Sequence, residues 1–176
     1  MKKPHLEQAY GYWKELLKPT DTVIDATCGN GHDTLRLAEL VPEGHVYAID
    51  VQEDAIANSR LRVSYPHVTY LHQSHTVLPK TSFKLIVYNL GYLPGGNKHL
   101  TTQSDTTLQS VQLAQEQLEV GGALSITCYP RHAEGEIEEK SLQRWFGQLD
   151  PQSWKVVYHF WKDKCPTLFF IYKFKN

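Results

Sequence analysis

Short apolar runs alternate along the chain with segments whose apolar residues recur at helical spacing. The runs that predict strands lie at 22–25, 45–50, 68–72, 83–90, 122–128, 154–161 and 167–174. Spacings of three and four residues predict helices over 31–41, 53–63, 106–118 and 135–149. An alternation of strands and helices predicts a mostly parallel sheet covered by helices.

The two ends of the chain complete this pattern. Apolar residues at helical spacing predict an amphipathic N-terminal helix over 1–18, ending before Pro19. Only residues 162–166 join the last two strands, which is too short for a parallel crossover, so these strands should form an antiparallel hairpin. The pair Gly121-Gly122 is a plausible stop for the third of the internal helices. We therefore predict an α/β fold with five parallel strands, a C-terminal antiparallel hairpin and helices on both faces.

Composition fits one domain over 1–176. With 176 residues, 41% of them hydrophobic, the chain can bury a sizeable core. It has no apolar run long enough to span a membrane, and no apolar stretch of the secretory type follows 1–5, so we expect a cytoplasmic protein. Cys28, Cys128 and Cys165 are widely spaced, which favours reduced, packed thiols over a zinc site or a disulfide framework.

The charge pattern does not announce a nucleic-acid binder. A net charge of −1 gives no global basic field. A local patch could still come from lysines near the two ends of the chain, although ordinary solvated lysines explain the same pattern. These lysines are Lys2, Lys3, Lys14, Lys18, Lys155, Lys162, Lys164, Lys173 and Lys175. The acidic stretch EGEIEEK, 134–140, is best interpreted as one solvated helix face.

The stretch DATCGNGHDT, 25–34, joins the first strand to a helix through a glycine turn. Such a turn lets backbone approach a ligand, and the helix N-terminus offers unpaired N–H groups, so the pattern predicts a nucleotide-like cofactor. Asp50 ends the second strand, where an acid can accept ribose hydroxyls. Thr34 stands where a dinucleotide fingerprint has its third glycine, which argues against NAD.

Several segments together are similar to one known family. DATCGNGHDT resembles motif I of class I methyltransferases, and NLGYLPGG, 89–96, resembles the N-P-P-Y motif of amino-group methyltransferases, with Leu90-Gly91 in place of two prolines. With Asp50 and Gln52, HQSH at 72–75, TTQSDTT at 101–107 and YPRH at 129–132, they resemble the YtqB-like (MnmM) family. The resemblance covers roughly 22–172.

That resemblance implies a Rossmann-like class I methyltransferase fold, S-adenosyl-L-methionine as cofactor and a tRNA anticodon stem-loop as partner. The acceptor it implies is the amino group of 5-aminomethyl-2-thiouridine at the wobble position. The expected cofactor-binding residues are Asp25, Cys28, Gly29, Asn30, Gly31, Asp50, Gln52, Ser74, His75 and Asn89. An rRNA base, a protein amine or a small molecule remains an alternative acceptor, and a non-catalytic cofactor-binding module remains a further alternative. A homodimer is possible.

Methyl transfer is an in-line displacement that needs positioning and exclusion of water rather than a metal. The expected catalytic residues are Asn89, Tyr92 and His132. The Asn89 carbonyl, with that of Leu90, could accept N–H bonds from the amine and aim its lone pair, although an Asn at a strand end also suits a simple turn.

Residues of the two late motifs are expected to meet the substrate. They are Tyr92, Gly95, Gly96, Tyr129 and Arg131. Tyr92 could stack on the uracil ring or merely pack the loop, and an arginine suits a flanking phosphate. His32, His75 and His132 each follow a predicted strand or turn at the ligand-binding edge, so any of them could serve as base or orienter or simply line that edge.

Overall fold

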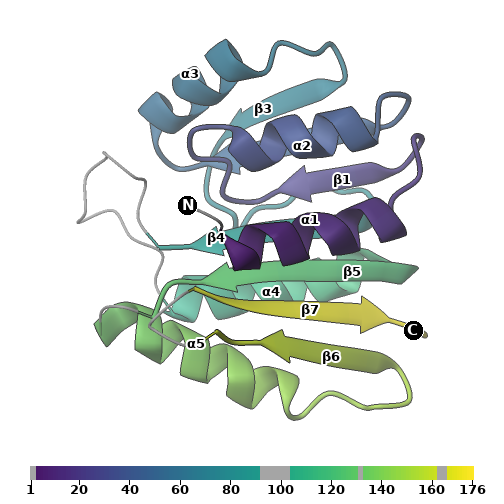
Figure 1. The fold of residues 1–176 in the computed structure, drawn as a ribbon, viewed down its shortest axis with the longest axis vertical. Helices are drawn as coiled ribbons and strands as arrows, with labels where there is room; N and C mark the ends of the chain where they lie inside the picture. The colour runs from purple at the N-terminus through teal and green to yellow at the C-terminus, as the bar shows by residue number, and fades with distance from the viewer. Residues whose placement is uncertain (1–2, 92–103, 131–132, 162–165) are drawn as a thin grey trace.

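The computed structural model describes residues 3–91, 104–130, 133–161 and 166–176 (Figure 1). Over these residues the strands are β1 (Thr22–Asp25), β2 (His45–Asp50), β3 (Val68–His72), β4 (Phe83–Leu90), β5 (Leu118–Cys128), β6 (Trp154–His159) and β7 (Thr167–Lys173). The helices are α1 (Pro4–Leu16), α2 (His32–Leu40), α3 (Glu53–Arg62), α4 (Ser104–Gln117) and α5 (Ala133–Phe146).

The described strands form one seven-stranded sheet in the order β3-β2-β1-β4-β5-β7-β6. Strands β1 to β5 pair in parallel, whereas β7 is antiparallel to both β5 and β6. The predicted Rossmann-like methyltransferase architecture is therefore confirmed. The carboxyl ends of β1 to β5 meet along one border of the sheet, which we call the carboxyl edge; in such sheets ligands bind there.

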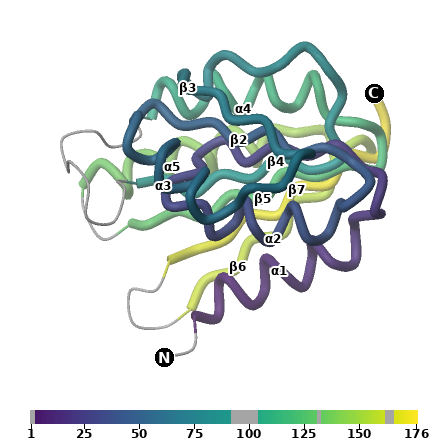
Figure 2. Tube along the Cα trace, turned by 90° about the horizontal axis from the view of Figure 1, so that it is seen from above, coloured from purple at the N-terminus to yellow at the C-terminus, as the bar shows by residue number. Residues whose placement is uncertain are grey.

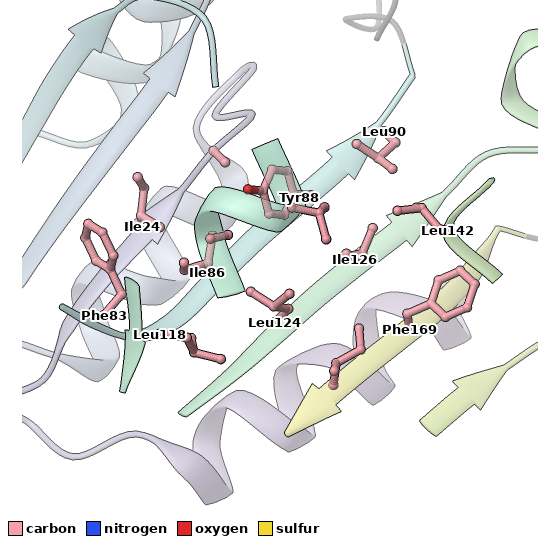
Figure 3. Close-up of a cluster of buried hydrophobic side chains, with 14 of the residues drawn as sticks. Ile24, Phe83, Ile86, Tyr88, Leu90, Leu118, Leu124, Ile126, Leu142 and Phe169 are labelled. Atoms are coloured by element: carbon pink, nitrogen blue, oxygen red, sulfur yellow. The ribbon is translucent and has the colours of Figure 1, made fainter. Parts of the chain in front are cut away.

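Helices cover both faces of the sheet. Helices α1, α2 and α3 lie on one face and α4 and α5 on the other, as the two perpendicular views show (Figures 1 and 2). Val111 of α4 and Leu142 of α5 are buried in one cluster with strand side chains such as Ile86 and Ile126 (Figure 3). Alternate residues of the same strands point to the opposite face, where they pack with α1 and α2.

Helix α1 is fixed to the second half of the sheet by its aromatic side chains. Trp13 is 1% exposed, and its Nε1 donates a 2.9 Å hydrogen bond to Ser125 Oγ in β5. Truncating a buried Trp to Ala typically costs about 3–5 kcal/mol, so this contact is a principal anchor. The helix is shorter than the predicted 1–18, because Leu17 already has extended backbone. Its N-terminal half lies at the carboxyl edge (Figure 1).

The prediction that Gly121-Gly122 ends a helix is wrong. Helix α4 stops at Gln117 and β5 begins at once, so both glycines lie inside the strand. Pairing between β4 and β5 is irregular there, and Gly121 has φ +81°. A Cβ on Gly122 would lie 2.8 Å from the Lys84 carbonyl oxygen. The glycines therefore accommodate a bulge, which demands left-handed backbone and close approach.

The acidic stretch of α5 is not wholly solvated, contrary to its interpretation as a solvated face. Glu138 is buried and accepts a hydrogen bond from the hydroxyl of Thr107 in α4. Glu139 accepts hydrogen bonds from the hydroxyls of Tyr158 and Thr167. The two carboxylates thus bind α5 to its neighbours, because the helix turns them inward, while Glu134 and Glu136 remain exposed.

One lysine of the suggested basic patch is also buried. Lys173 is 6% exposed, and its Nζ donates to the carbonyl oxygens of Leu118 at 2.8 Å and Gln115 at 3.3 Å. Lys173 therefore closes the end of α4 and cannot contact RNA. Lys2, Lys162 and Lys164 lie outside the described residues.

Two of the three cysteines agree with the prediction of packed thiols. Cys28 and Cys128 are free and buried, as expected for packed thiols, and Cys165 lies outside the described residues. None of the helices in the described segments is long and apolar enough to cross a membrane.

Candidate active site

The turn after β1 depends on two glycines with left-handed backbone. Gly29 has φ +51° and Gly31 has φ +79°, values that residues with a Cβ rarely adopt. The Gly31 N–H donates to the Cys28 carbonyl oxygen at 2.8 Å, which closes the turn immediately before α2. The backbone thus reverses within a few residues and leaves the N-terminus of α2 at the carboxyl edge, as the glycine pattern predicted.

Asp50 connects this turn to the end of β2. Its Oδ2 accepts the Gly29 N–H at 2.9 Å, and its Oδ1 accepts the Gln52 N–H at 3.0 Å. The side chain is only partly buried. Because each carboxylate oxygen can accept two hydrogen bonds, Asp50 retains capacity for two hydroxyl donors. The acid and the glycine turn, which the sequence analysis treated separately, are therefore parts of one hydrogen-bonded unit.

Gly31 is required because the neighbouring helix α3 leaves no room for a Cβ. This differs from the expectation that the glycine lets a ligand approach the turn. A Cβ at this position would lie 2.6 Å from Ser59 Oγ and 2.9 Å from Ser59 Cα in α3. A side chain would therefore collide with a neighbouring helix. Its predicted direct contact with a cofactor stays a prediction.

Asp25 lies under the turn with no exposed surface. Its Oδ2 accepts a 2.7 Å hydrogen bond from Thr34 Oγ1, which joins the end of β1 to the first turn of α2. Burial, and next the charge of Asp33, raise the pKa of Asp25, whereas the Thr34 hydrogen bond opposes this rise. The observed role of Asp25 is thus to hold α2 against the sheet, and its contact with a cofactor stays a prediction.

Asn89, at the end of β4, is held from two sides. Its backbone N–H donates to Thr27 Oγ1 at 2.7 Å, and its side-chain Nδ2 donates to Asp33 Oδ2 at 2.5 Å. A carboxylate can only accept hydrogen bonds, so Nδ2 of Asn89 must face Asp33. Oδ1 of Asn89 then lies on the opposite side of the planar amide group. Asn89 is partly exposed, so this oxygen belongs to a side chain that a substrate at the carboxyl edge could reach.

Asp33 and Tyr10 are site residues that the sequence analysis missed. Tyr10 OH donates to Asp33 Oδ1 at 2.7 Å, so the two carboxylate oxygens take one side chain each, from α1 and from β4. Burial and the neighbouring Asp33 raise the pKa of Tyr10, which keeps the phenol protonated as a donor. The partners of Asp33 are 23 and 56 residues away along the chain, so no local pattern could reveal them.

The backbone after Asn89 departs from that of a motif with prolines. Gly91 has φ +149°, whereas a proline is fixed near −65°. A Cβ on Gly91 would meet the ring of Tyr129 at 3.8 Å, so the residues after β4 and β5 lie side by side. Burial raises the pKa of Tyr129 to about 12, and the His5 and Tyr129 ring centroids lie 6.1 Å apart in an edge-on contact. The structure thus places Tyr129 beside Gly91, just after β4, and its contact with an acceptor stays a prediction.

Two of the remaining predicted cofactor residues, Asn30 and Ser74, form hydrogen bonds with nearby parts of the protein. Asn30 is turned toward α3, because its Oδ1 accepts from Asn58 at 3.3 Å and its backbone carbonyl accepts from Arg62 at 2.7 Å. Ser74 is engaged in its own turn through Thr76.

His75 lies just beyond β3 and is buried. Its Nδ1 has no hydrogen-bond partner within the described part of the chain. Burial lowers the pKa of His75, so the neutral ring is favoured. A buried nitrogen without a partner near the carboxyl edge is an atom that a bound ligand could satisfy. Cys28 is also buried there, at 4% exposure.

Five of the predicted site residues belong to segments outside the described part of the chain. Tyr92, Gly95, Gly96, Arg131 and His132 lie outside the described residues. His32 is exposed at the start of α2. Within the described segments no group of three or more metal-ligating side chains occurs.

The fold and this edge define a Rossmann-like class I methyltransferase. Residues 46–173 match the family described as "Putative rRNA methylase", and the chain belongs to this family. It is 34% identical to the chloroplastic tRNA (mnm(5)s(2)U34)-methyltransferase of Arabidopsis thaliana, over 99% of this chain and 71% of that protein.

Solved structures give the same result. A protein of Clostridium thermocellum described as a "putative rRNA-methylase" superposes with a TM-score of 0.93 at 32% identity, covering 98% of both chains. A protein of Streptococcus mutans described as "a putative methyltransferase", solved in complex with SAH, gives a TM-score of 0.88 at 30% identity, covering 98% of this chain and 99% of that one. The similarity spans the whole chain, so it includes both the glycine turn and the β4 end.

Proposed function

We propose that this protein transfers a methyl group from S-adenosylmethionine to the amino group of 5-aminomethyl-2-thiouridine at the tRNA wobble position. The observation that carries the proposal is the 34% identity, over 99% of this chain, to the Arabidopsis tRNA (mnm(5)s(2)U34)-methyltransferase. The arrangement of Asp50 and Asn89 at one edge of the sheet supports it, because donor and acceptor must meet there.

The residues at the carboxyl edge fit S-adenosylmethionine. Asp50 has acceptor capacity for two ribose hydroxyls beside the glycine turn, and His75 offers a buried nitrogen without a partner near the place expected for the adenine. When bound, S-adenosylmethionine supplies a methyl group on a sulfonium. We propose that the cofactor lies beside the turn backbone at 28–31 and is held by four residues: Gly29, Asp50, Gln52 and His75.

The acceptor side requires a neutral amine. A free alkylamine is largely protonated near neutral pH, so the site must disfavour the ammonium or take its proton. We propose that Asn89 Oδ1 accepts an N–H of the amine and holds its lone pair toward the donor, since Nδ2 is already bound to Asp33. Tyr129 would shield the amine from water, and Tyr92, Gly95, Gly96, Arg131 and His132 remain proposed substrate or catalytic residues.

We infer that the protein contacts tRNA through the anticodon stem-loop. We also propose that it is a single-domain enzyme located in the cytoplasm. Its proposed oligomeric state is a homodimer. Light scattering of the purified protein tests the dimer, and cell fractionation tests the location.

Nucleoside mass spectrometry of cells that lack the gene tests the function. We expect tRNA from these cells to accumulate 5-aminomethyl-2-thiouridine and to lose its methylated form, with recovery when the gene is restored. The rRNA nucleosides from the same cells are the control, because the family description refers to rRNA. A change confined to rRNA, with normal tRNA nucleosides, would overturn the proposed substrate.

A further inference from the structure

Asp33 forms a bridge between three elements of the carboxyl edge. It lies in the first turn of α2 and is 8% exposed. One oxygen accepts the hydroxyl of Tyr10 from α1 at 2.7 Å, and the other accepts the amide of Asn89 from β4 at 2.5 Å. Charge-assisted hydrogen bonds of this length are among the stronger contacts that a side chain makes.

We propose that Asp33 is a positioning residue of the methyl transfer, which fixes the Asn89 amide so that its oxygen faces the acceptor amine, while Tyr10 holds Asp33 in place. This inference rests on the proposed function. Without a fixed neighbour, the amide of an Asn can rotate by half a turn and exchange its donor and acceptor atoms. Asp33 removes this freedom, because an amide oxygen turned toward the carboxylate would set two acceptors against each other.

A role in helix capping does not account for Asp33. Helix α2 has no side-chain cap at its N-terminus, and the oxygens of Asp33 bind side chains of other elements instead. Asp33 also carries a cost, because its charge adds to the burial that raises the pKa of nearby Asp25. Two acidic side chains held close together in a buried region are expected where function requires them.

Two substitutions separate geometry from charge. Asp33→Ala frees the Asn89 amide and should lower kcat on unmethylated tRNA by about 30-fold, since loss of alignment alone costs up to about 100-fold. Asp33→Asn should retain at least about a third of the wild-type kcat, because its single oxygen can accept from Asn89 while its amide donates to the Tyr10 hydroxyl. Calorimetry should give both variants a cofactor Kd within about twofold of wild type.

Helix α1 provides a matched pair of tyrosines. Tyr10→Phe removes the 2.7 Å bond to Asp33 and should lower kcat by about threefold to tenfold. Tyr12→Phe removes a hydrogen bond of the same length, to His159 Nε2, on a different part of the sheet. Tyr12→Phe should therefore also loosen α1, by no more than Tyr10→Phe does because its partner is not a carboxylate, but it should keep wild-type kcat. Equal losses of kcat in the two variants would show that only the attachment of α1 matters.

A double-mutant cycle tests whether Asp33 acts through Asn89. In a protein that already carries Asn89→Ala, adding Asp33→Ala should change kcat by less than about twofold. Multiplicative effects of the two substitutions would overturn the proposal, because a merely structural role of Asp33 would add to any other defect.

A substrate-independent measurement completes the test. In nitrogen-15 spectra, the side-chain amide of Asn89 should exchange slowly in wild type and in Tyr12→Phe, and rapidly in Asp33→Ala. An unchanged Asn89 amide signal in folded Asp33→Ala would contradict the bridge whatever the substrate is. If wild type fails to methylate the tRNA while the amide signal responds as expected, the proposed substrate is wrong and the fixing of Asn89 by Asp33 stands.

Discussion

Thr34 Oγ1 donates a 2.7 Å hydrogen bond to Oδ2 of the fully buried Asp25 carboxyl group. The hydroxyl occupies the place where dinucleotide-binding turns carry a third glycine to let helix and strand approach. Here the helix and strand are joined through this bond instead. A turn of this kind depends on a buried acid, so its stability should depend on pH.

Asp25→Asn should reveal that dependence. Burial, and then the charge of Asp33, raise the pKa of Asp25 above its usual value of 3.8 in the folded protein. The folded state therefore binds this proton more tightly than the unfolded chain does. The contribution of Asp25 to stability is fully present below pH 3.8 and is lost as pH rises through the raised pKa. We expect the free energy of unfolding of wild type, measured in urea, to fall relative to Asp25→Asn as pH rises above 3.8. Parallel pH profiles would contradict this account.

Asp50→Ala should weaken S-adenosylmethionine binding at least about tenfold. Each charge-assisted bond from a ribose hydroxyl is worth about 1.5–3 kcal/mol, and the same carboxylate also orders Gly29. The control is Asp54→Ala, which removes an equal charge from an exposed position at the start of α3. Calorimetry on the two folded variants makes the comparison. Similar affinity in both would remove Asp50 from the cofactor site.

Gly31→Ala should destabilise the protein, in contrast to the same change at Gly11. Position 31 combines φ +79° with a Cβ only 2.9 Å from Ser59 Cα, so we expect a loss of about 1–3 kcal/mol in the free energy of unfolding. Gly11 lies in α1, where a Cβ would meet nothing within 4 Å, and Ala there should add about 0.4–1 kcal/mol. Thermal unfolding of both variants checks the signs, and a stable Gly31→Ala protein would contradict the packing argument.

The sequence predicted the central strands well because β1 and β4 are mostly buried and therefore carry nearly continuous apolar runs. Strands β1 to β4 occupy the predicted residues, and the short link before β7 gave the hairpin. The interpretation of Gly121-Gly122 was wrong because glycine serves helix ends and β-bulges equally, and only the pairing with Phe83 and Leu85 separates the two. The two glycines therefore marked an irregular point in the chain, but the sequence could not show whether it was a helix end or a β-bulge.

The candidate site was predictable where it depends on neighbouring residues. The glycine turn and Asp50 follow from strand ends that parallel pairing must bring together. Asp33 was overlooked within the same motif, since its significance comes from Tyr10 and Asn89, which belong to other elements. Contacts between distant elements are set by packing, and a single sequence carries no direct signal for them.

Asn89→Ala should separate chemistry from cofactor binding. Removing an oxygen that orients the amine should lower kcat by about 100-fold, equivalent to about 2.7 kcal/mol, at saturating S-adenosylmethionine. Cofactor affinity should change little, because the bond from Asn89 to Thr27 of the 25–34 turn is made by the backbone N–H and remains in the variant. Near-normal turnover by the variant would mean that the amine is held elsewhere.

Methylation of purified tRNA tests the central claim most directly. The wild-type protein is incubated with S-adenosylmethionine and with tRNA from cells lacking the gene, and the digested nucleosides are analysed by mass spectrometry. We predict conversion of 5-aminomethyl-2-thiouridine to its methylated form by wild type, and about 100-fold slower conversion by Asn89→Ala. An unchanged aminomethyl nucleoside after incubation with folded, cofactor-binding wild-type protein would contradict the proposed function.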